Sequence, residues 1–83
     1  MKCPNLNLIE LSDNRISDIN VLEEISFPKL KYLYLSNNII SDISVFERAK
    51  LNNLELNLRG NKIDKDKYLS IIEKLYLSCE LKI

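Results

Sequence analysis

Leucine and isoleucine recur at fixed spacings through the first three quarters of the chain. Residues 4–27 and 28–51 align with an offset of 24, and 11 of the 24 aligned pairs are identical. Each copy follows the pattern L-x-x-L-x-L-x-x-N-x-I, and apolar residues two positions apart share one face of a strand. This agreement predicts a structural repeat. The pattern residues are Leu6, Ile9, Leu11, Asn14 and Ile16 in the first copy and Leu30, Leu33, Leu35, Asn38 and Ile40 in the second.

A third copy over residues 52–64 is one residue short. It ends in "LNLRGNKI", and its Asn61 follows Asn38 by 23 residues, whereas Asn38 follows Asn14 by 24. Because strand side chains alternate between two faces, a missing residue moves the upstream leucines to the wrong side unless the backbone bends. The sequence therefore predicts a local irregularity over residues 52–55.

The strands of successive copies can lie side by side in a parallel sheet. Each asparagine comes where the chain leaves its strand, so that nearby backbone N–H and C=O groups lose their strand partners. A side-chain amide carries a donor and an acceptor and can satisfy both kinds of group. We therefore predict a structural ladder of Asn14, Asn38 and Asn61 along the stack.

Short helices are predicted behind the sheet. Residues 20–23 and 44–47 have the form of a capping box, so helices should begin near Val21 and Val45. The residues expected to pack inward from these segments are Leu22, Ile25 and Phe46.

The repeat stops after Ile63, and residues 65–83 differ in pattern. They begin with an amphipathic helix for which Asp64 is available as the N-cap. We expect its apolar stripe to cover the end of the stack, as terminal repeats must; a helix that binds a partner is the alternative. The segment 81–83 alternates like a strand and would begin a fourth one. The stripe consists of Tyr68, Ile71, Ile72 and Leu75.

No covering segment precedes the first copy, because residues 1–3 lead directly into Pro4. The apolar end of the first copy is therefore expected to be open. About three repeats are the minimum for a stable stack. The chain would then be a segment of a longer array, a truncated gene product, or a subunit that pairs end to end.

The two cysteines, Cys3 and Cys79, lie at opposite ends of the chain. Three strand spacings would separate them by roughly 14 Å, whereas a disulfide needs Cα atoms within about 7 Å. Free thiols are therefore expected, which agrees with a reducing compartment.

Composition narrows the function. Basic and acidic residues number 12 each, so no charge attracts the chain to nucleic acid, and no apolar run approaches the ~20 residues of a membrane span. There is no histidine, which removes the commonest general base and metal ligand. We therefore expect a cytoplasmic or nuclear protein that is not an enzyme, has no cofactor or metal, and binds neither nucleic acid nor membrane.

The repeats resemble the leucine-rich repeat superfamily, whose period is commonly 20 to 29 residues. The "N-x-I-S-D-I" runs at 14–19 and 38–43 are similar to the phosphatase-regulator type, and "CPNLNLIELSDNRI" at 3–16 is similar to the acidic leucine-rich nuclear phosphoproteins. The resemblance implies an α/β fold in one domain, residues 1–83. That fold is a short right-handed solenoid of about three repeats with a parallel concave sheet, short convex helices and a C-terminal capping helix.

The superfamily also implies protein binding. Histone or phosphatase binding is not carried over, because the acidic tail that gives the phosphoproteins their name is absent.

The strand positions that the repeat pattern leaves free are the candidate binding residues. Tyr32 and Tyr34 are two apart and so share the concave face, where tyrosine and arginine are typical of binding hot spots. The alternative is that the tyrosines are solvent-facing residues favoured for their strand propensity. The predicted protein-binding residues are Leu8, Glu10, Tyr32, Tyr34, Asn37, Glu55, Asn57 and Arg59, joined by Lys82 if a fourth strand forms.

The sequence thus predicts a non-catalytic protein–protein interaction module. The alternative is a structural segment of a longer array, or a subunit that associates with itself through its N-terminal end, without an independent ligand.

Overall fold

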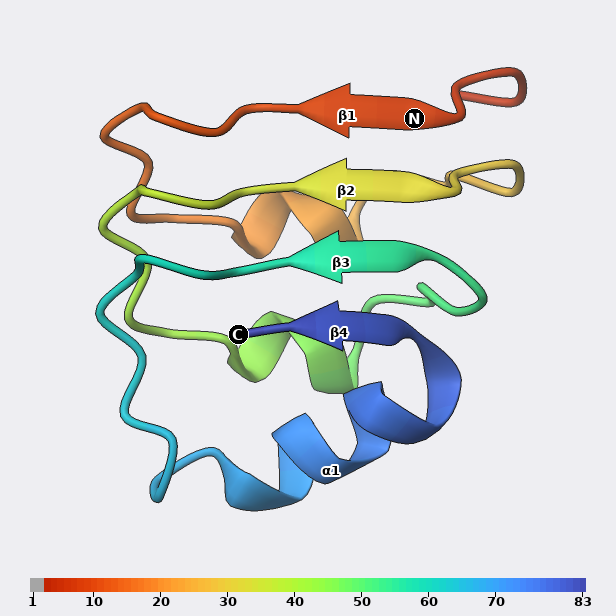
Figure 1. Ribbon diagram of the computed structural model, residues 1–83. Coiled ribbons are helices and arrows are strands. Elements are labelled where there is room, and N and C mark those ends of the chain that lie inside the picture. Colours follow the sequence, from red (N-terminus) through yellow and green to blue (C-terminus); the bar gives the residue numbers. More distant parts are fainter. Residues whose placement is uncertain (1–2) are drawn as a thin grey trace.

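A computed structural model describes residues 3–83, and in it the chain winds through four parallel strands that lie side by side (Figure 1). The strand order in the sheet is the order in the sequence. The predicted parallel sheet and its fourth strand are both confirmed. We call each turn of the chain a rung: rung 1 is residues 4–27, rung 2 is 28–51, rung 3 is 52–79 and rung 4 is the last strand. The strands are β1 (Leu8–Glu10), β2 (Tyr32–Tyr34), β3 (Glu55–Asn57) and β4 (Glu80–Lys82).

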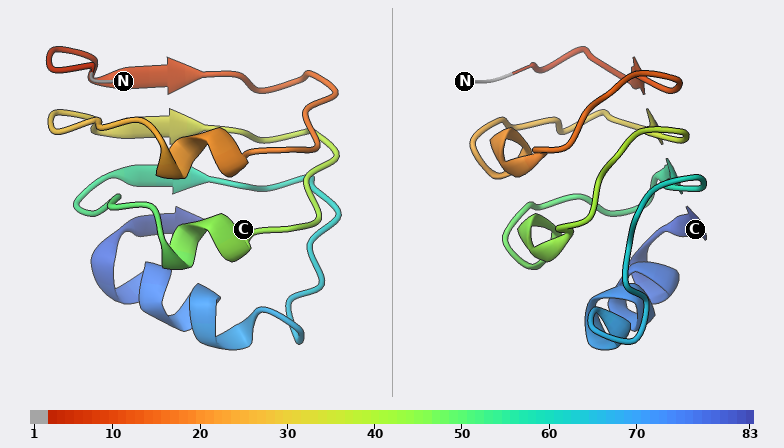
Figure 2. Two further views of the ribbon diagram at one scale, coloured as in Figure 1. Left: turned by 180° about the vertical axis from the view of Figure 1, so that it is seen from behind. Right: turned by 90° about the vertical axis from the view of Figure 1, so that its left-hand side faces the viewer.

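Three helical segments form a second layer behind the sheet (Figure 2). The first two, η1 (Asn20–Glu23) and η2 (Ser44–Glu47), are single turns of 3-10 helix, and the third, α1 (Leu69–Ser78), is an α-helix. The predicted short helices behind rungs 1 and 2 are therefore confirmed.

The predicted capping boxes are wrong, because neither η1 nor η2 receives a side-chain cap from its own first residue. Instead, a carboxylate two residues upstream accepts the free N–H. Asp18 accepts from the N–H of Asn20 and Asp42 from that of Ser44, each at 2.9 Å. Aspartate favours such a turn because its side chain reaches the backbone two residues further on. Hydrogen bonds from the hydroxyl and N–H of Ser44 also lower the pKa of Asp42.

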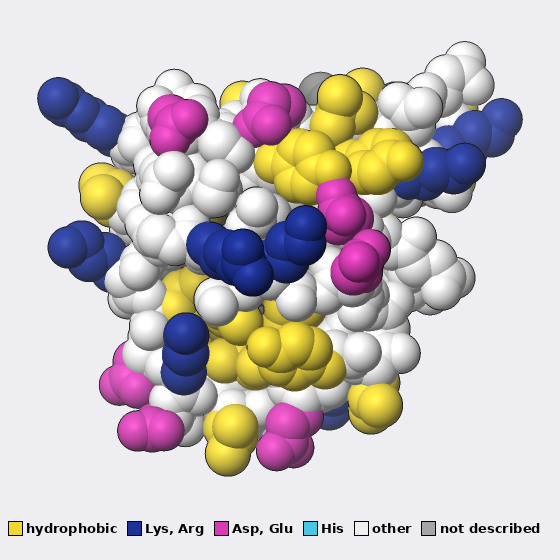
Figure 3. Space-filling view, viewed as in Figure 1, with side chains coloured by type: hydrophobic (Ala, Val, Ile, Leu, Met, Phe, Trp, Pro, Cys, Tyr) yellow, Lys and Arg dark blue, Asp and Glu magenta, His cyan; other side chains and the backbone are white. Residues whose placement is uncertain are grey.

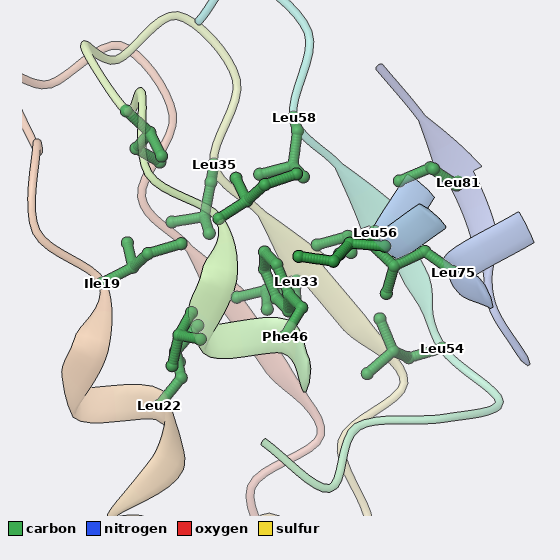
Figure 4. Packing of buried hydrophobic residues seen from close by; sticks show 14 of the residues in the cluster. Ile19, Leu22, Leu33, Leu35, Phe46, Leu54, Leu56, Leu58, Leu75 and Leu81 are labelled. Carbon is green, nitrogen blue, oxygen red and sulfur yellow. The ribbon is translucent and has the colours of Figure 1, made fainter. Parts of the chain in front are cut away.

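The core lies between the two layers (Figure 4). The register aligns the middle residues of the strands, Ile9, Leu33, Leu56 and Leu81, and all of these belong to the core or pack against it. From behind the sheet, Leu22 and Phe46 are buried as predicted, whereas Ile25 is half-buried. Hydrophobic burial at equivalent positions of successive rungs therefore joins the rungs into one structure.

The predicted asparagine ladder is confirmed for Asn38 and Asn61, whereas Asn14 donates to the Leu11 and Ser12 carbonyls of its own rung. The amide nitrogen of Asn38 donates to the carbonyls of Leu11 and Leu35, each at 3.0 Å, and its oxygen accepts from the N–H of Ile16 at 3.0 Å. Asn61 makes the equivalent bonds one rung further along. Each of these amides therefore joins its own rung to the preceding one.

The predicted irregularity in the short third copy is confirmed at Asn53, whose φ of 55° is left-handed. The register places the next residue, Leu54, beside the exposed Lys31, and yet Leu54 is buried. Asparagine tolerates this backbone conformation better than most residues. Leu54 lies two residues before the buried Leu56 and is buried on the same side of the chain, in spite of the missing residue.

The C-terminal helix covers the far end of the core. α1 contacts both η2 and β4, and it buries Ile71, Ile72 and Leu75, while Tyr68 is half-buried. α1 begins at Leu69 rather than directly after Asp64. The Asp64 carboxylate instead accepts from two N–H groups of the preceding turn, both at 3.2 Å.

Both Cys3 and Cys79 are free thiols. The start of the chain, Met1 and Lys2, which we expected to lead directly into the first repeat, lies outside the described residues. Over residues 3–83, no helix has the length and apolar character that crossing a membrane requires.

Candidate functional site

The outer side of the sheet carries two rows of side chains, which together we call the sheet face. Side chains alternate along a strand, so the residues on either side of each buried middle position point away from the core. The register brings seven of the predicted binding residues together in these rows, Lys82 of the fourth strand included. The first row is Leu8, Tyr32, Glu55 and Glu80, and the second is Glu10, Tyr34, Asn57 and Lys82.

The two tyrosines form the aromatic part of the sheet face. Their ring centroids are 6.0 Å apart and the rings are tilted by 44°. Leu8 pairs with Tyr32 across the strands, and both are exposed. In Figure 3, which views the molecule as Figure 1 does, hydrophobic side chains gather at the level of β1 and β2, basic side chains lie across the level of β3, and a second hydrophobic group lies below them. Among the two rows themselves, the apolar and aromatic residues lie on β1 and β2, and most of the charged ones lie on β3 and β4.

Glu55 links three strands of the sheet face. The hydroxyl of Tyr34 on β2 donates a hydrogen bond to Glu55 Oε2 on β3. Lys82 on β4 places its Nζ 3.8 Å from Glu55 Oε1. Two neighbours thus hold this carboxylate, and it in turn fixes the Tyr34 ring, so the ring loses little conformational freedom if a partner packs on it.

The same contact perturbs the ionisation of Tyr34. The hydrogen bond to Glu55, together with desolvation and the negative charge of that carboxylate, raises the pKa of Tyr34 to about 12. An unperturbed tyrosine ionises near pH 10. Tyr34 is therefore a neutral hydrogen-bond donor at any physiological pH.

A shallow groove of about 640 Å³ runs beside the first row. Its lining includes Lys31, Tyr32, Glu55, Leu77 and Glu80. The groove extends the sheet face toward α1, and it combines an aromatic ring, an exposed leucine and charges of both signs. Such a mixture is typical of a protein-binding surface rather than of a small-molecule pocket.

The structure places Asn37 beyond the end of β2, where its N–H donates to the carbonyl of Arg59 at 2.8 Å. Asn37 belongs to the turn that follows β2, where its φ is 56°, and its amide nitrogen donates to Asp13 Oδ1 at 2.9 Å. The same turn position is occupied by Asp13 in rung 1 and by Gly60 in rung 3, and both of these also have positive φ. Asn37 thus serves the turn rather than the sheet face.

Arg59 lies just beyond β3, next to the end of the second row. Its backbone N–H donates to the Asn57 side chain at 3.1 Å, and its own side chain is exposed. Arg59 therefore extends the charged end of the sheet face.

Sequence reasoning missed Glu80. The signal was present, because Glu80 lies two residues before Lys82 and the fourth strand was expected only from Leu81 onward. The structure starts β4 one residue earlier and places Glu80 beside Glu55 in the first row.

The sheet face contains no arrangement suited to catalysis. No described residue is a histidine, and within residues 3–83 no group of three cysteine, aspartate or glutamate side chains is placed to hold a metal ion. The serines on this side, Ser12 and Ser36, bond to each other at 2.9 Å. This hydrogen bond joins rung 1 to rung 2.

The fold and the sheet face together define a class: a short repeat solenoid that presents a sheet to solvent. Comparison with protein families agrees, because the family model described as "Leucine Rich repeats (2 copies)" matches residues 4–53, which is 50 of the 83 residues. The chain belongs to the leucine-rich repeat family. The comparisons with curated proteins and with solved structures gave no match. Domains of this family generally mediate protein–protein interactions and are typically not enzymes.

Proposed function

We propose that the chain is a non-catalytic module that binds a protein ligand on its sheet face. The observation that carries the proposal is the Tyr32–Tyr34 pair, backed by Glu55 and bordered by the exposed Leu8. Tyrosine buries a large apolar area at small entropic cost, and its hydroxyl can remain hydrogen-bonded. A ring held in place before binding contributes more of its contact energy to affinity.

The charges of the sheet face favour a ligand with a mixed surface. An apolar or aromatic segment of the ligand would pack on Leu8 and the two rings, and polar groups would meet Glu80, Asn57 and Arg59 at the other end. The resemblance to the phosphatase-regulator type and to the acidic leucine-rich nuclear phosphoproteins stays a prediction, as does a cytoplasmic or nuclear location.

The test begins with affinity capture from the source cell followed by mass spectrometry. Each captured protein is then titrated calorimetrically against the wild type and against the Tyr32→Ala/Tyr34→Ala double variant. Loss of a hot spot costs about 2 kcal/mol or more, which corresponds to at least roughly a 30-fold weaker affinity.

The matched control is Tyr76→Ala on α1. Tyr76 is 57 % exposed and Tyr32 is 41 % exposed, so the control removes a comparably exposed ring away from the sheet face. We expect unchanged affinity for this variant. If the double variant bound every captured partner as tightly as the wild type did, the proposal would be wrong.

The alternative function, self-association without an independent ligand, is favoured by a different observation: the exposed leucines of rung 1. If this alternative were correct, the affinity capture would recover only further copies of the same chain.

A further inference from the structure

The N-terminal end of the solenoid exposes apolar residues that are buried one rung further along. Leu6 is 38 % exposed where its equivalent Leu30 is 5 % exposed, and Leu11 is 42 % exposed where Leu35 is 2 % exposed. These residues border a hollow of about 460 Å³ whose lining is almost entirely apolar. Exposed apolar patches of this kind mark interaction sites on soluble proteins. We call Leu6, Ile9, Leu11, Ile16 and Val21, all of which line the hollow, the open end.

The opposite end of the solenoid is covered. Leu81, the last middle residue of the sheet, is buried, and α1 lies beyond β4 along the stack (Figure 1). A second copy therefore finds no open apolar end at the C-terminus on which to continue the row. Over the described residues, the matching apolar surface for the open end of one copy is the open end of a second copy. Two identical surfaces that cover each other form a closed dimer with two-fold symmetry.

The edge of β1 carries backbone groups that the later rungs use for pairing. The N–H of Tyr32, Glu55 and Glu80 donates to the carbonyl of the preceding rung. The carbonyls of Tyr34, Asn57 and Lys82 accept from an N–H of the preceding rung.

Leu8 of β1 is equivalent to Tyr32 of β2, and Glu10 is equivalent to Tyr34. The Leu8 N–H and the Glu10 C=O therefore point away from β2, at the open edge of the sheet. In an antiparallel pair, directly opposite residues exchange N–H···O bonds. If Leu8 of one copy lies opposite Glu10 of the other, each Leu8 N–H donates to the Glu10 carbonyl of the other copy.

Charge along the open edge also selects the antiparallel arrangement. Acidic Glu10 and Asp13 lie at the carboxyl end of β1, with Arg15 close by in the sequence. At the amino end, Lys29 and Lys31 of the neighbouring rung 2 line a groove with Asn5 and Asn7, and the Lys31 N–H donates to the Asn7 carbonyl at 2.9 Å. A two-fold axis between the two copies of β1 sets the acidic end of each copy toward the basic end of the other.

We propose that two copies of the chain pair through their open ends, with their β1 edges antiparallel, to form one continuous eight-stranded sheet. The apolar open ends meet beneath the joined strands, and the sheet faces of both copies point the same way. The occupant of the open end is thus a second copy of this chain. The inference is independent of any ligand on the sheet face.

The test is the sedimentation of the purified chain from roughly 1 μM to roughly 1 mM, the range that covers weak to moderate dimers. The expected result is a change from a 9.7 kDa monomer to a dimer and no further. Leu11→Glu places a charge in the open end and should abolish the dimer. Leu69→Glu is the matched control, because Leu69 is a comparably exposed leucine, at 55 %, on α1, and this variant should dimerise as the wild type does.

A monomer at every concentration would overturn the proposal, as would growth beyond the dimer, or a dimer that Leu11→Glu leaves intact. Circular dichroism melting of each variant shows whether it is folded.

If Leu11→Glu fails to fold, Leu8→Pro takes its place. The Leu8 N–H faces away from β2, so proline removes a donor to the second copy and none to β2, and edge strands tolerate proline. A dimer that persists in folded Leu8→Pro would contradict the pairing of the β1 edges.

The antiparallel arrangement has its own test in a charge exchange. Glu10→Lys and Lys31→Glu, made singly, should each weaken the dimer by no more than about fivefold, as exposed charge pairs do. The double variant should return toward the wild-type dissociation constant. If the double variant were as weak as both single changes multiplied, the two charges would not face each other across the dimer.

Discussion

Rungs 1 and 2 have nearly the same sequence pattern and very different surroundings. Leu11 and Leu35 are identical residues that directly follow β1 and β2, and yet the first is exposed and the second is buried. Asn14 is exposed and bonds only within its own rung, whereas Asn38 is buried and bonds across two rungs. Burial in this fold therefore depends on neighbouring rungs, as expected for a repeat protein stabilised by nearest-neighbour contacts.

The comparison is tested most strongly by truncating the two leucines. Leu35→Ala removes a fully enclosed side chain and should lower the free energy of unfolding by about 2 to 5 kcal/mol. Leu11→Ala makes the same chemical change at the exposed position and should cost less than about 1 kcal/mol. Urea unfolding at low protein concentration, where dimers do not form, measures both. Equal losses would mean that rung 1 is packed as tightly as rung 2.

The two asparagines should differ by a smaller amount. Asn38→Ala leaves the Ile16 N–H without its acceptor, and it removes one of the two side-chain amide donors to each of the Leu11 and Leu35 carbonyls. A buried group that loses its hydrogen bond costs about 1 to 3 kcal/mol. Asn14→Ala removes two bonds to exposed carbonyls of rung 1 and should cost well under about 1 kcal/mol. The same urea experiment compares them, and a larger loss for Asn14→Ala would contradict the ladder.

The smallest expected effect concerns the sheet face, where Glu10 of rung 1 is replaced by Tyr34 in rung 2. Tyr34 should ionise near pH 12 in an absorbance titration. Its folded pKa is raised above the unfolded value near 10, so its contribution to stability is complete below pH 10 and is lost as the pH rises toward 12.

Glu55→Gln removes the acceptor carboxylate, the main cause of the raised pKa, and should bring the titration of Tyr34 down toward 10. Gln substitution at Glu10 is the control, because that carboxylate contributes least among the causes and should leave the titration near 12. An unchanged titration in Glu55→Gln would show that the hydrogen bond to Glu55 does not form in solution.

Much of the fold could be predicted because two copies of the repeat carry the same type of residue at equivalent positions. The alternation of Leu33 and Leu35 with the two tyrosines was enough to assign the strand, its buried side and its exposed side. The role of Asn38 followed from the backbone groups that are left unpaired where the chain leaves a strand.

Other features depended on local geometry that the pattern does not contain. The capping residues are Asp18 and Asp42 rather than the first residues of η1 and η2, because single 3-10 turns begin earlier than the capping-box pattern assumes. Asn37 was grouped with the sheet face because counting along the pattern does not show where φ becomes positive. Glu80 was missed because β4 has only three residues, and alternation over so few residues does not show where a strand begins.

The central claim is that, within residues 3–83, rung 1 is held from one side only, and amide hydrogen exchange of the monomer tests it most directly. The Leu11 and Leu35 amides both donate to a carbonyl of the following rung, each at 2.9 Å, so their hydrogen bonds are matched. We predict that the Leu11 amide exchanges at least roughly tenfold faster, since about 1.4 kcal/mol less free energy is needed to open a rung that lacks a neighbour. Equal protection of the two amides in the monomer would contradict the account.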